Sequence, residues 1–137
     1  MSGRTLAAAA ALLLTLTCGC DDGRVDTVPV SGVVVFADGE PVRTGTIEFQ
    51  SREHGTTSSS RIGQEGEFTL GTYDVGDGAP AGEHDVIVVQ LVIDDGTIDH
   101  VVDHGRGVPP KYRGYDSSPL RTTVGEDGED ALRVVLK

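Results

Sequence analysis

Two histidines stand four residues apart in the segment DHVVDH, and each directly follows an aspartate. Imidazole nitrogens and carboxylate oxygens are common zinc ligands, and on a helix this spacing would place both rings on one face. His100, His104 and Asp103 are therefore the candidate metal ligands of the chain. The segment has no helical pattern and its third ligand is unidentified, so we favour a solvated loop and keep the metal site as an alternative.

A second candidate is a group of bases in an otherwise acidic chain. It lies in residues 106–124, RGVPPKYRGYDSSPLRTTV, which carry four bases and one acid. The paired prolines cannot continue a strand ladder because proline has no N–H, and Tyr112 has a large apolar ring that could hold the loop against a sheet. We interpret the stretch as a rigid strap. The alternative is a docking surface for an anionic glycan, a lipid headgroup or an acidic protein, lined by Lys111, Tyr112, Arg113 and Tyr115, with Arg113 and Tyr115 as its exposed contacts.

Residues that could support hydrolysis or calcium binding lack the partner groups that these functions require. The run TTSSSR offers hydroxyls without an assigned base, and acidic glycine turns such as DVGDG lack the alternating ligands of a calcium loop. Weak Ca²⁺ binding at these turns stays open, although ordinary turn chemistry explains them. We expect solvated loops at His54 and His84, and we expect neither a catalytic site nor a cofactor.

The first twenty residues have the pattern of an export signal. Arg4 precedes an uncharged apolar run from Leu6 to Leu16, which is shorter than the roughly 20 apolar residues that span a bilayer and suits a secretory signal peptide. The run ends in LTCGC, which resembles the lipobox of bacterial lipoproteins, with the small residue Gly19 before the cysteine. The resemblance implies cleavage after Gly19 and lipid attachment to Cys20. An ordinary secreted protein with a nearby cleavage site is the alternative.

Charge and cysteine content limit the other functions. The chain has 22 acids against 11 bases and a formal charge of −11, which repels phosphate, so nucleic acid is not an expected partner. Its 2 cysteines both lie at the signal, so we expect no disulfide and no thiol nucleophile in the exported part. We expect residues 1–19 to be the signal peptide, 20–27 a lipidated tether and 28–137 one folded domain.

Short apolar segments alternate with glycine, aspartate and proline from residue 28 onward, and none has a helical period. In GTIEFQ, EFTL and ALRVVL every second residue is apolar, which indicates strands with one buried face, while DVIVVQLVI is apolar on both faces and suits a central strand. Glycine turns in ADGEPV, QEGEF and GEDGED would join neighbouring strands. Seven such strands, with a long loop at 94–119, indicate a sandwich or a barrel. The expected ranges are 28–37, 44–50, 57–62, 67–73, 83–93, 120–124 and 131–136.

Four segments together resemble carboxypeptidase regulatory-like, or transthyretin-like, domains. They are VPVSGVVVFADGEPVRTGTIEFQ, EGEFTL, APAGEHDVIV, and VPPKY followed by SPLRTTV, the last being similar to a tail common in small lipoproteins of planctomycete-type bacteria. His84 stands where the family usually has an aromatic residue. The resemblance covers residues 28–137 and implies an all-β, seven-stranded Greek-key β-sandwich of the transthyretin type, without a characterised catalytic site.

These residues lead us to expect a lipid-anchored protein of the bacterial cell envelope that faces the periplasm or the exterior. Its β-sandwich would have a structural or interaction role and no enzymatic one. The alternative is an envelope lipoprotein that binds a metal or another ligand through residues 94–116, and an envelope hydrolase is the third hypothesis. The membrane is the expected partner through the lipid, with an envelope protein or a glycan as the candidate second partner.

Overall fold

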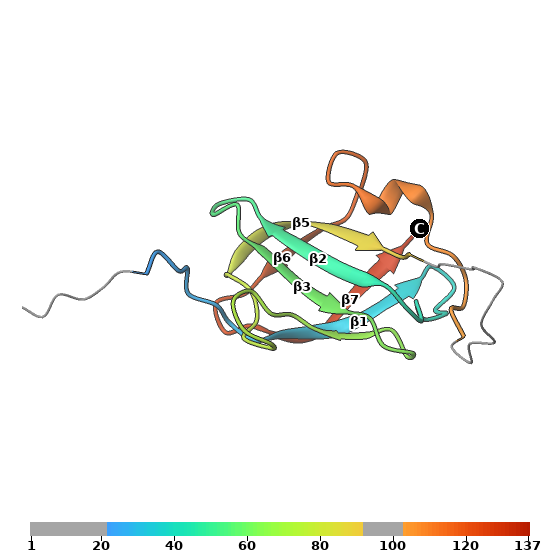
Figure 1. Cartoon of the computed structure of the whole chain (residues 1–137), viewed down its shortest axis with the longest axis horizontal. Coiled ribbons are helices and arrows are strands. Elements are labelled where there is room, and N and C mark those ends of the chain that lie inside the picture. Colours follow the sequence, from blue (N-terminus) through green and yellow to red (C-terminus); the bar gives the residue numbers. More distant parts are fainter. Residues whose placement is uncertain (1–21, 92–102) are drawn as a thin grey trace, which may run out of the picture.

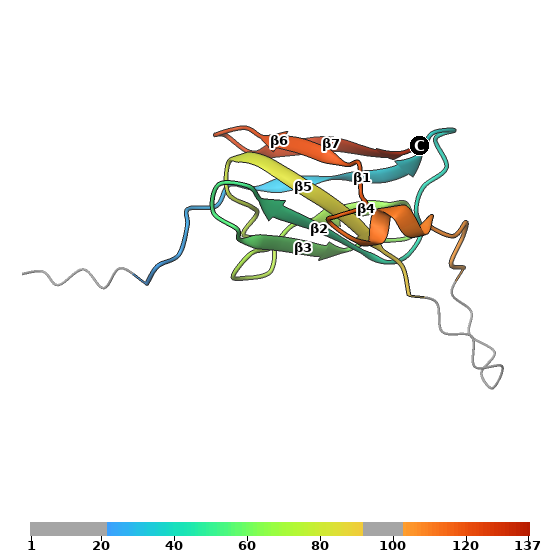
Figure 2. The ribbon, with the colours of Figure 1, turned by 90° about the horizontal axis from the view of Figure 1, so that it is seen from above.

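The computed structural model describes residues 22–91 and 103–137, which form two β-sheets and one short 3₁₀ helix (Figure 1). One sheet has three strands in the order β4-β1-β7, and the other has four in the order β3-β2-β5-β6. The two sheets lie face to face as layers (Figure 2). The elements are β1 Val30–Phe36, β2 Thr46–Ser51, β3 Thr57–Arg61, β4 Glu67–Thr69, β5 Gly82–Val89, η1 Pro110–Arg113, β6 Arg121–Val124 and β7 Glu129–Leu136.

The two sides of this sandwich differ in how they are closed. On one side, the backbones of Ser59 and Gly71 exchange two hydrogen bonds of 2.9 and 3.0 Å, which link β3 to the chain just after β4. On the other side, the only described partner of β6 is β5, and the only described partner of β7 is β1, to which it is parallel. Among the described residues no backbone bond joins β6 to β7, so this side of the sandwich is open.

Residues that alternate along the strands point into the core, as predicted. In β2, Ile47 and Phe49 are fully buried while Glu48 between them is partly exposed, and in β7 Val134 and Leu136 are buried. Burying each such side chain contributes about 1.5–3 kcal/mol, which drives the two sheets together. The core cluster comprises Val30, Val34, Phe36, Val42, Ile47, Phe49, Ile62, Phe68, Leu70, Ala79, Val86, Val88, Val108, Tyr112, Val124, Val134 and Leu136.

The central position predicted for the most apolar strand is confirmed. β5 lies between β2 and β6, with Val86 and Val88 in the core and Ile87 also buried, at 6% exposure, on the opposite face. Most strands match their expected ranges to within two residues, but two end four residues earlier than expected: β4 ends at Thr69 and β5 ends at Val89.

The glycine turns form where they were expected, but those at Gly39 and Gly128 do not join neighbouring strands of one sheet. Gly39, with φ of 91°, donates its N–H to the carbonyl of Phe36 and reverses the chain after β1. The returning segment then pairs with β1 itself, where the N–H of Val42 bonds to the carbonyl of Val34 at 3.0 Å. The turn at Gly128 joins β6 to β7, which lie in different sheets, so it is a crossover between the layers.

The expectation of a solvated loop at His84 is wrong. The residue lies in β5 and is fully buried, and its ring packs against Phe49 with the centroids 5.8 Å apart. The pleat explains the difference, because His84 has the same parity as Val86 and Val88 and therefore points into the core with them. Its Nδ1 lies 3.0 Å from the carbonyl oxygen of Gly82, and burial lowers the pKa of the ring. The histidine ring is thus part of the packed interior beside Phe49. His54, in contrast, is exposed in a turn, as expected.

Candidate functional site

The basic segment lies at one end of the sandwich, where η1 sits beside β5 near the end of the chain (Figure 1). Tyr112 in η1 is 1% exposed, and its hydroxyl accepts a hydrogen bond of 2.6 Å from the backbone N–H of Lys137 and donates one to the carbonyl of the same residue. The ring therefore pins the segment to the end of β7, which is what the strap interpretation predicted for Tyr112.

Gln90 holds the same segment from the other side and was not found by sequence reasoning. Its side chain is nearly buried, and its Nε2 donates to the carbonyls of Thr44, at 3.2 Å, and His104, at 3.4 Å. Its Oε1 accepts the backbone N–H of Val108 at 3.0 Å. The signal was present in the sequence as one amide inside the apolar run VVQLV, where a buried polar group needs partners.

Arg106 attaches the segment to the turn after β1. Its guanidinium makes two hydrogen bonds to the carboxylate of Asp38, at 2.9 and 3.0 Å, and lies 3.5 Å from Glu40. The same group stacks over the ring of Phe36, 3.8 Å from its centroid. The hydrogen bond from Arg106 lowers the pKa of Asp38, and Asp38 in turn raises the pKa of Arg106. The guanidinium of Arg106 is therefore already paired with acidic side chains of the same domain.

The candidate metal ligands are not brought together in the part of the chain that the structure describes. Asp103 is exposed and lies 3.5 Å from Arg43 in an ion pair, His104 is partly buried, and His100 lies outside the described residues. Within the described ranges no group of three or more His, Cys, Asp or Glu side chains could hold a metal ion. The acidic turn DVGDG uses Asp77 to accept the backbone N–H groups of residues 72–74 at 2.6, 3.1 and 3.0 Å, which is turn chemistry.

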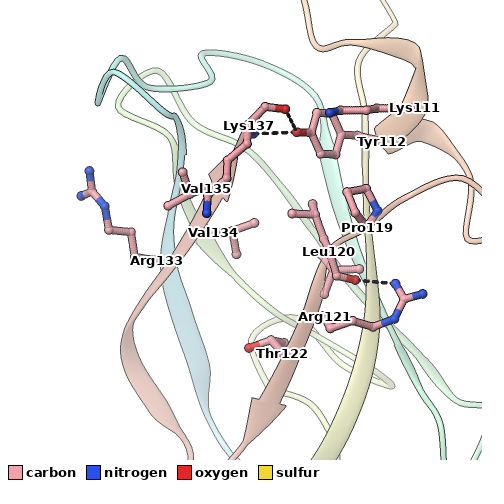
Figure 3. Close-up of a pocket in the computed structure, with 11 residues that line it drawn as sticks. Lys111, Tyr112, Pro119, Leu120, Arg121, Thr122, Arg133, Val134, Val135 and Lys137 are labelled. Carbon is pink, nitrogen blue, oxygen red and sulfur yellow. Dashed lines mark hydrogen bonds between the residues drawn. The ribbon is translucent and has the colours of Figure 1, made fainter.

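A groove opens between β6 and β7 on the open side of the sandwich (Figure 3). We call it the basic groove, because its lining includes four bases and no acid; its volume is about 400 Å³. Leu120 and Val134 lie between the two strands, while Arg121 and Arg133 lie on the two flanks (Figure 3). The lining residues are Val86, Lys111, Tyr112, Pro119, Leu120, Arg121, Thr122, Arg133, Val134, Val135 and Lys137.

The bases of this groove differ in their partners. Arg121 is held by Asp85, 2.7 Å from its Nε, and by the carbonyls of Leu120 and Ser118 at 2.7 and 3.0 Å. Lys111, Arg133 and Lys137 form no ion pair with any described acid, although the amine of Lys111 lies 5.0 Å from the ring centroid of Tyr112. Arg113, exposed in η1 near the groove, likewise has no acidic partner in the described ranges.

Tyr115 does not have the exposed position that the docking hypothesis gave it. It is partly buried, and its hydroxyl donates to Glu48 at 3.3 Å. Burial, together with the charge of Glu48, raises the pKa of Tyr115 to about 12. This residue therefore contacts β2 and does not line the basic groove, whereas Lys111 and Tyr112 do.

The first described residues lie at the opposite end of the domain. The backbone N–H of Val25 bonds to the hydroxyl of Tyr73 at 2.9 Å, and the guanidinium of Arg24 lies 5.1 Å from the same ring centroid. Figure 1 shows this segment leaving the sandwich at the end away from Lys137. No helix in the described ranges is long and apolar enough to cross a membrane.

Comparison with known proteins gives no relative for this chain: no family model, no curated protein and no solved structure matches it. The described residues define a two-sheet, all-β protein with a basic groove on its open side. Any function must therefore be argued from these residues and their geometry.

Proposed function

We propose that this chain is a lipid-anchored protein of the bacterial cell envelope, whose transthyretin-like β-sandwich is a non-enzymatic interaction module. The observation that carries the proposal is the collection of Lys111, Arg133 and Lys137 around one groove, without described acidic partners, in a chain with a formal charge of −11. A surface of opposite sign to the rest of the molecule suits recognition of an anionic partner.

The strand order supports the Greek-key part of the proposal. β2, β3 and β4 follow one another and are neighbours in space, because the Ser59–Gly71 bonds link β3 to the chain beside β4. β5 then returns to pair with β2, the first strand of the set. Three consecutive neighbouring strands with the fourth beside the first is the Greek-key arrangement.

The proposed anchor is consistent with the position of the tether. Cys20 would precede the segment that Tyr73 holds through Val25, at the end of the domain away from Lys137. Two or more acyl chains give stable anchoring, at about 0.8 kcal/mol for each buried methylene. A domain held in this way would direct its basic groove away from its own membrane surface, toward partners in the envelope space.

The alternative of ligand binding through residues 94–116 is favoured by one observation. Lys111 and Arg113 lie on η1, both exposed and both without an acidic partner in the described ranges. This pair suits an anion better than a metal cation. Titration of the full chain, in mild detergent, with Ca²⁺, Zn²⁺ and anionic glycans would separate the hypotheses, since saturable heat with an ion or a glycan would favour the alternative.

The anchor is tested by the variant Cys20→Ala in cells supplied with labelled palmitate. We expect the label on the parent protein, no label on Cys20→Ala, and a mature N-terminus at residue 20 by mass spectrometry. Cys18→Ala is the matched control and should keep the label, because the neighbouring thiol is removed with the signal. Label on Cys20→Ala, or a mature chain that starts elsewhere, would overturn the anchor.

A further inference from the structure

Among the described strands, none pairs with the second edge of β7, and Tyr112 marks which backbone groups face that edge. β7 pairs with β1 alone, while the hydroxyl of Tyr112 approaches the N–H and carbonyl of Lys137 from the side of the basic groove. Successive residues of a strand direct their backbone groups to opposite edges. Val135 and Arg133 have the same parity as Lys137, so their N–H and carbonyl groups face the groove as well, and no described backbone group bonds to them there.

The side chains around this edge also alternate in character. Val134 points toward the core and, with Leu120, forms an apolar floor (Figure 3). Arg133 is exposed on the outward-facing row of β7, Lys137 is exposed directly after the strand, and neither has an acidic partner in the described ranges. A strand laid along this edge would therefore have apolar contacts on one of its faces and cations beside the other.

We infer that the open edge of β7 is a docking site for an extended acidic peptide, which adds to the three-stranded sheet as a fourth strand. Its backbone would pair with Val135 and Arg133, its apolar side chains would cover Leu120 and Val134, and its carboxylates would meet Arg133 and Lys137. This inference names the partner of the interaction role proposed above and rests on that role, but it does not depend on the lipid.

Three observations favour a peptide over other anionic partners. Unpaired backbone groups are best satisfied by another backbone, which is how exposed sheet edges take up extended segments. Glycan binding uses exposed aromatic faces, and the aromatic ring at this groove, Tyr112, is 1% exposed. A second copy of the chain would bring Arg133 and Lys137 close to the same bases, and bases on an edge strand oppose such self-pairing.

The test uses a fluorescent peptide of alternating aspartate and valine and the full chain in mild detergent. We expect saturable binding by fluorescence anisotropy that weakens at higher salt, and no binding of the matched lysine–valine peptide. The double variant Arg133→Glu/Lys137→Glu should bind the acidic peptide at least about tenfold more weakly. The double variant Arg24→Glu/Arg61→Glu, which changes two exposed bases outside the groove, is the charge-matched control and should bind like the parent.

Backbone pairing is tested on the peptide, so that folding of the protein is not at risk. A peptide with the same sequence but N-methylated at every residue keeps its charge and has no N–H to donate on either edge, and we expect it not to bind. Equal binding of the methylated peptide, equal binding by the double variant, or no binding of the acidic peptide would each overturn the docking site. So would self-association of the chain that the peptide displaces. The palmitate result for Cys20 is independent of all these outcomes.

Discussion

The hydroxyl of Tyr112 bonds to both backbone groups of Lys137, 25 residues further along the chain. One side chain thereby joins the basic segment to the end of β7 and occupies the last position on the open edge of that strand. The bases of this segment thus have two roles: Arg106 fastens it to Asp38 and Glu40, while Lys111 lines the groove.

Removing the Tyr112 hydroxyl should loosen this junction while keeping the buried ring. We expect Tyr112→Phe to lower the free energy of unfolding by about 1–2 kcal/mol, because two hydrogen bonds to the backbone of Lys137 are lost without a change of packing. Urea denaturation followed by circular dichroism measures the change. Tyr73→Phe is the control: its hydroxyl holds only the exposed tether at Val25, so a smaller loss is expected. A larger loss in the control would contradict the assignment of Tyr112 as the anchor.

Gln90 should contribute more, because its amide has three backbone partners and sits in a nearly buried position. We expect Gln90→Leu to cost about 2–3 kcal/mol, since the N–H of the buried Val108 would lose its acceptor without gaining water. Thermal or urea unfolding gives the value. Gln50→Leu, on the partly exposed face of β2, is the matched control and should change stability by less than about 1 kcal/mol. Similar losses of stability in both variants would show that the three hydrogen bonds of Gln90 do not stabilise the fold.

Sequence reasoning predicted the elements well where a local rule decides them. The alternation in GTIEFQ placed Ile47 and Phe49 inside because the pleat repeats every two residues, and the double-sided apolar run marked the central strand β5. Glycine turns were found for the same reason. The extra length predicted for β4 and β5 came from apolar residues that continue beyond the last ladder bond, and the ladder depends on a distant partner strand.

The candidate site was only partly predictable, because its parts come from distant segments. Tyr112 and Lys111 were identified from the composition of their loop. Arg133 in β7 and Lys137 directly after it reach the groove only because the two sheets pack with β7 opposite β6. Tyr115 was predicted to be exposed, but its hydroxyl donates a hydrogen bond to Glu48, which lies 67 residues away in the sequence. No local sequence pattern predicts a contact between residues so far apart in the chain.

The buried His84 should make stability depend on pH. Its pKa is lowered from 6.5 by burial, so the unfolded chain binds the proton at a higher pH than the folded chain does. Stability is therefore fully present above pH 6.5 and falls as the pH drops below this value, with a slope of at most about 1.4 kcal/mol per pH unit for one proton. Urea denaturation at several pH values above those at which the carboxylates titrate would measure the slope.

His84→Phe should abolish this part of the pH dependence, because the phenyl ring can pack against Phe49 and takes up no proton. Ser51→Ala is the control: Ser51 is opposite His84 on β2 and is equally buried, but its hydroxyl does not titrate. The control should lower stability equally at every pH and keep the slope. An unchanged slope in His84→Phe would show that other groups cause the pH dependence.

Two glycines with the same φ allow the cost of backbone strain to be measured separately from the cost of a steric clash. Gly39 and Gly78 both have φ of 91°, but a Cβ on Gly39 would meet nothing within 4 Å, while one on Gly78 would lie 1.8 Å from the carbonyl oxygen of Val28. Gly39→Ala should therefore cost only the left-handed backbone penalty, about 1–2 kcal/mol. Gly78→Ala carries the same penalty and must also displace Val28, whose N–H and carbonyl pair with Ala79.

We expect Gly78→Ala to destabilise the protein by at least about 2 kcal/mol more than Gly39→Ala, because the chain entering β1 cannot move without breaking the Val28–Ala79 bonds. The same displacement should free the tether from the sandwich, so cleavage by a protease between residues 22 and 28 should become faster in this variant alone. Urea denaturation and timed proteolysis measure the two effects. Equal costs for the two substitutions would show that the entry of the chain at Val28 is not fixed by this contact, and that the tether is held by Tyr73 alone.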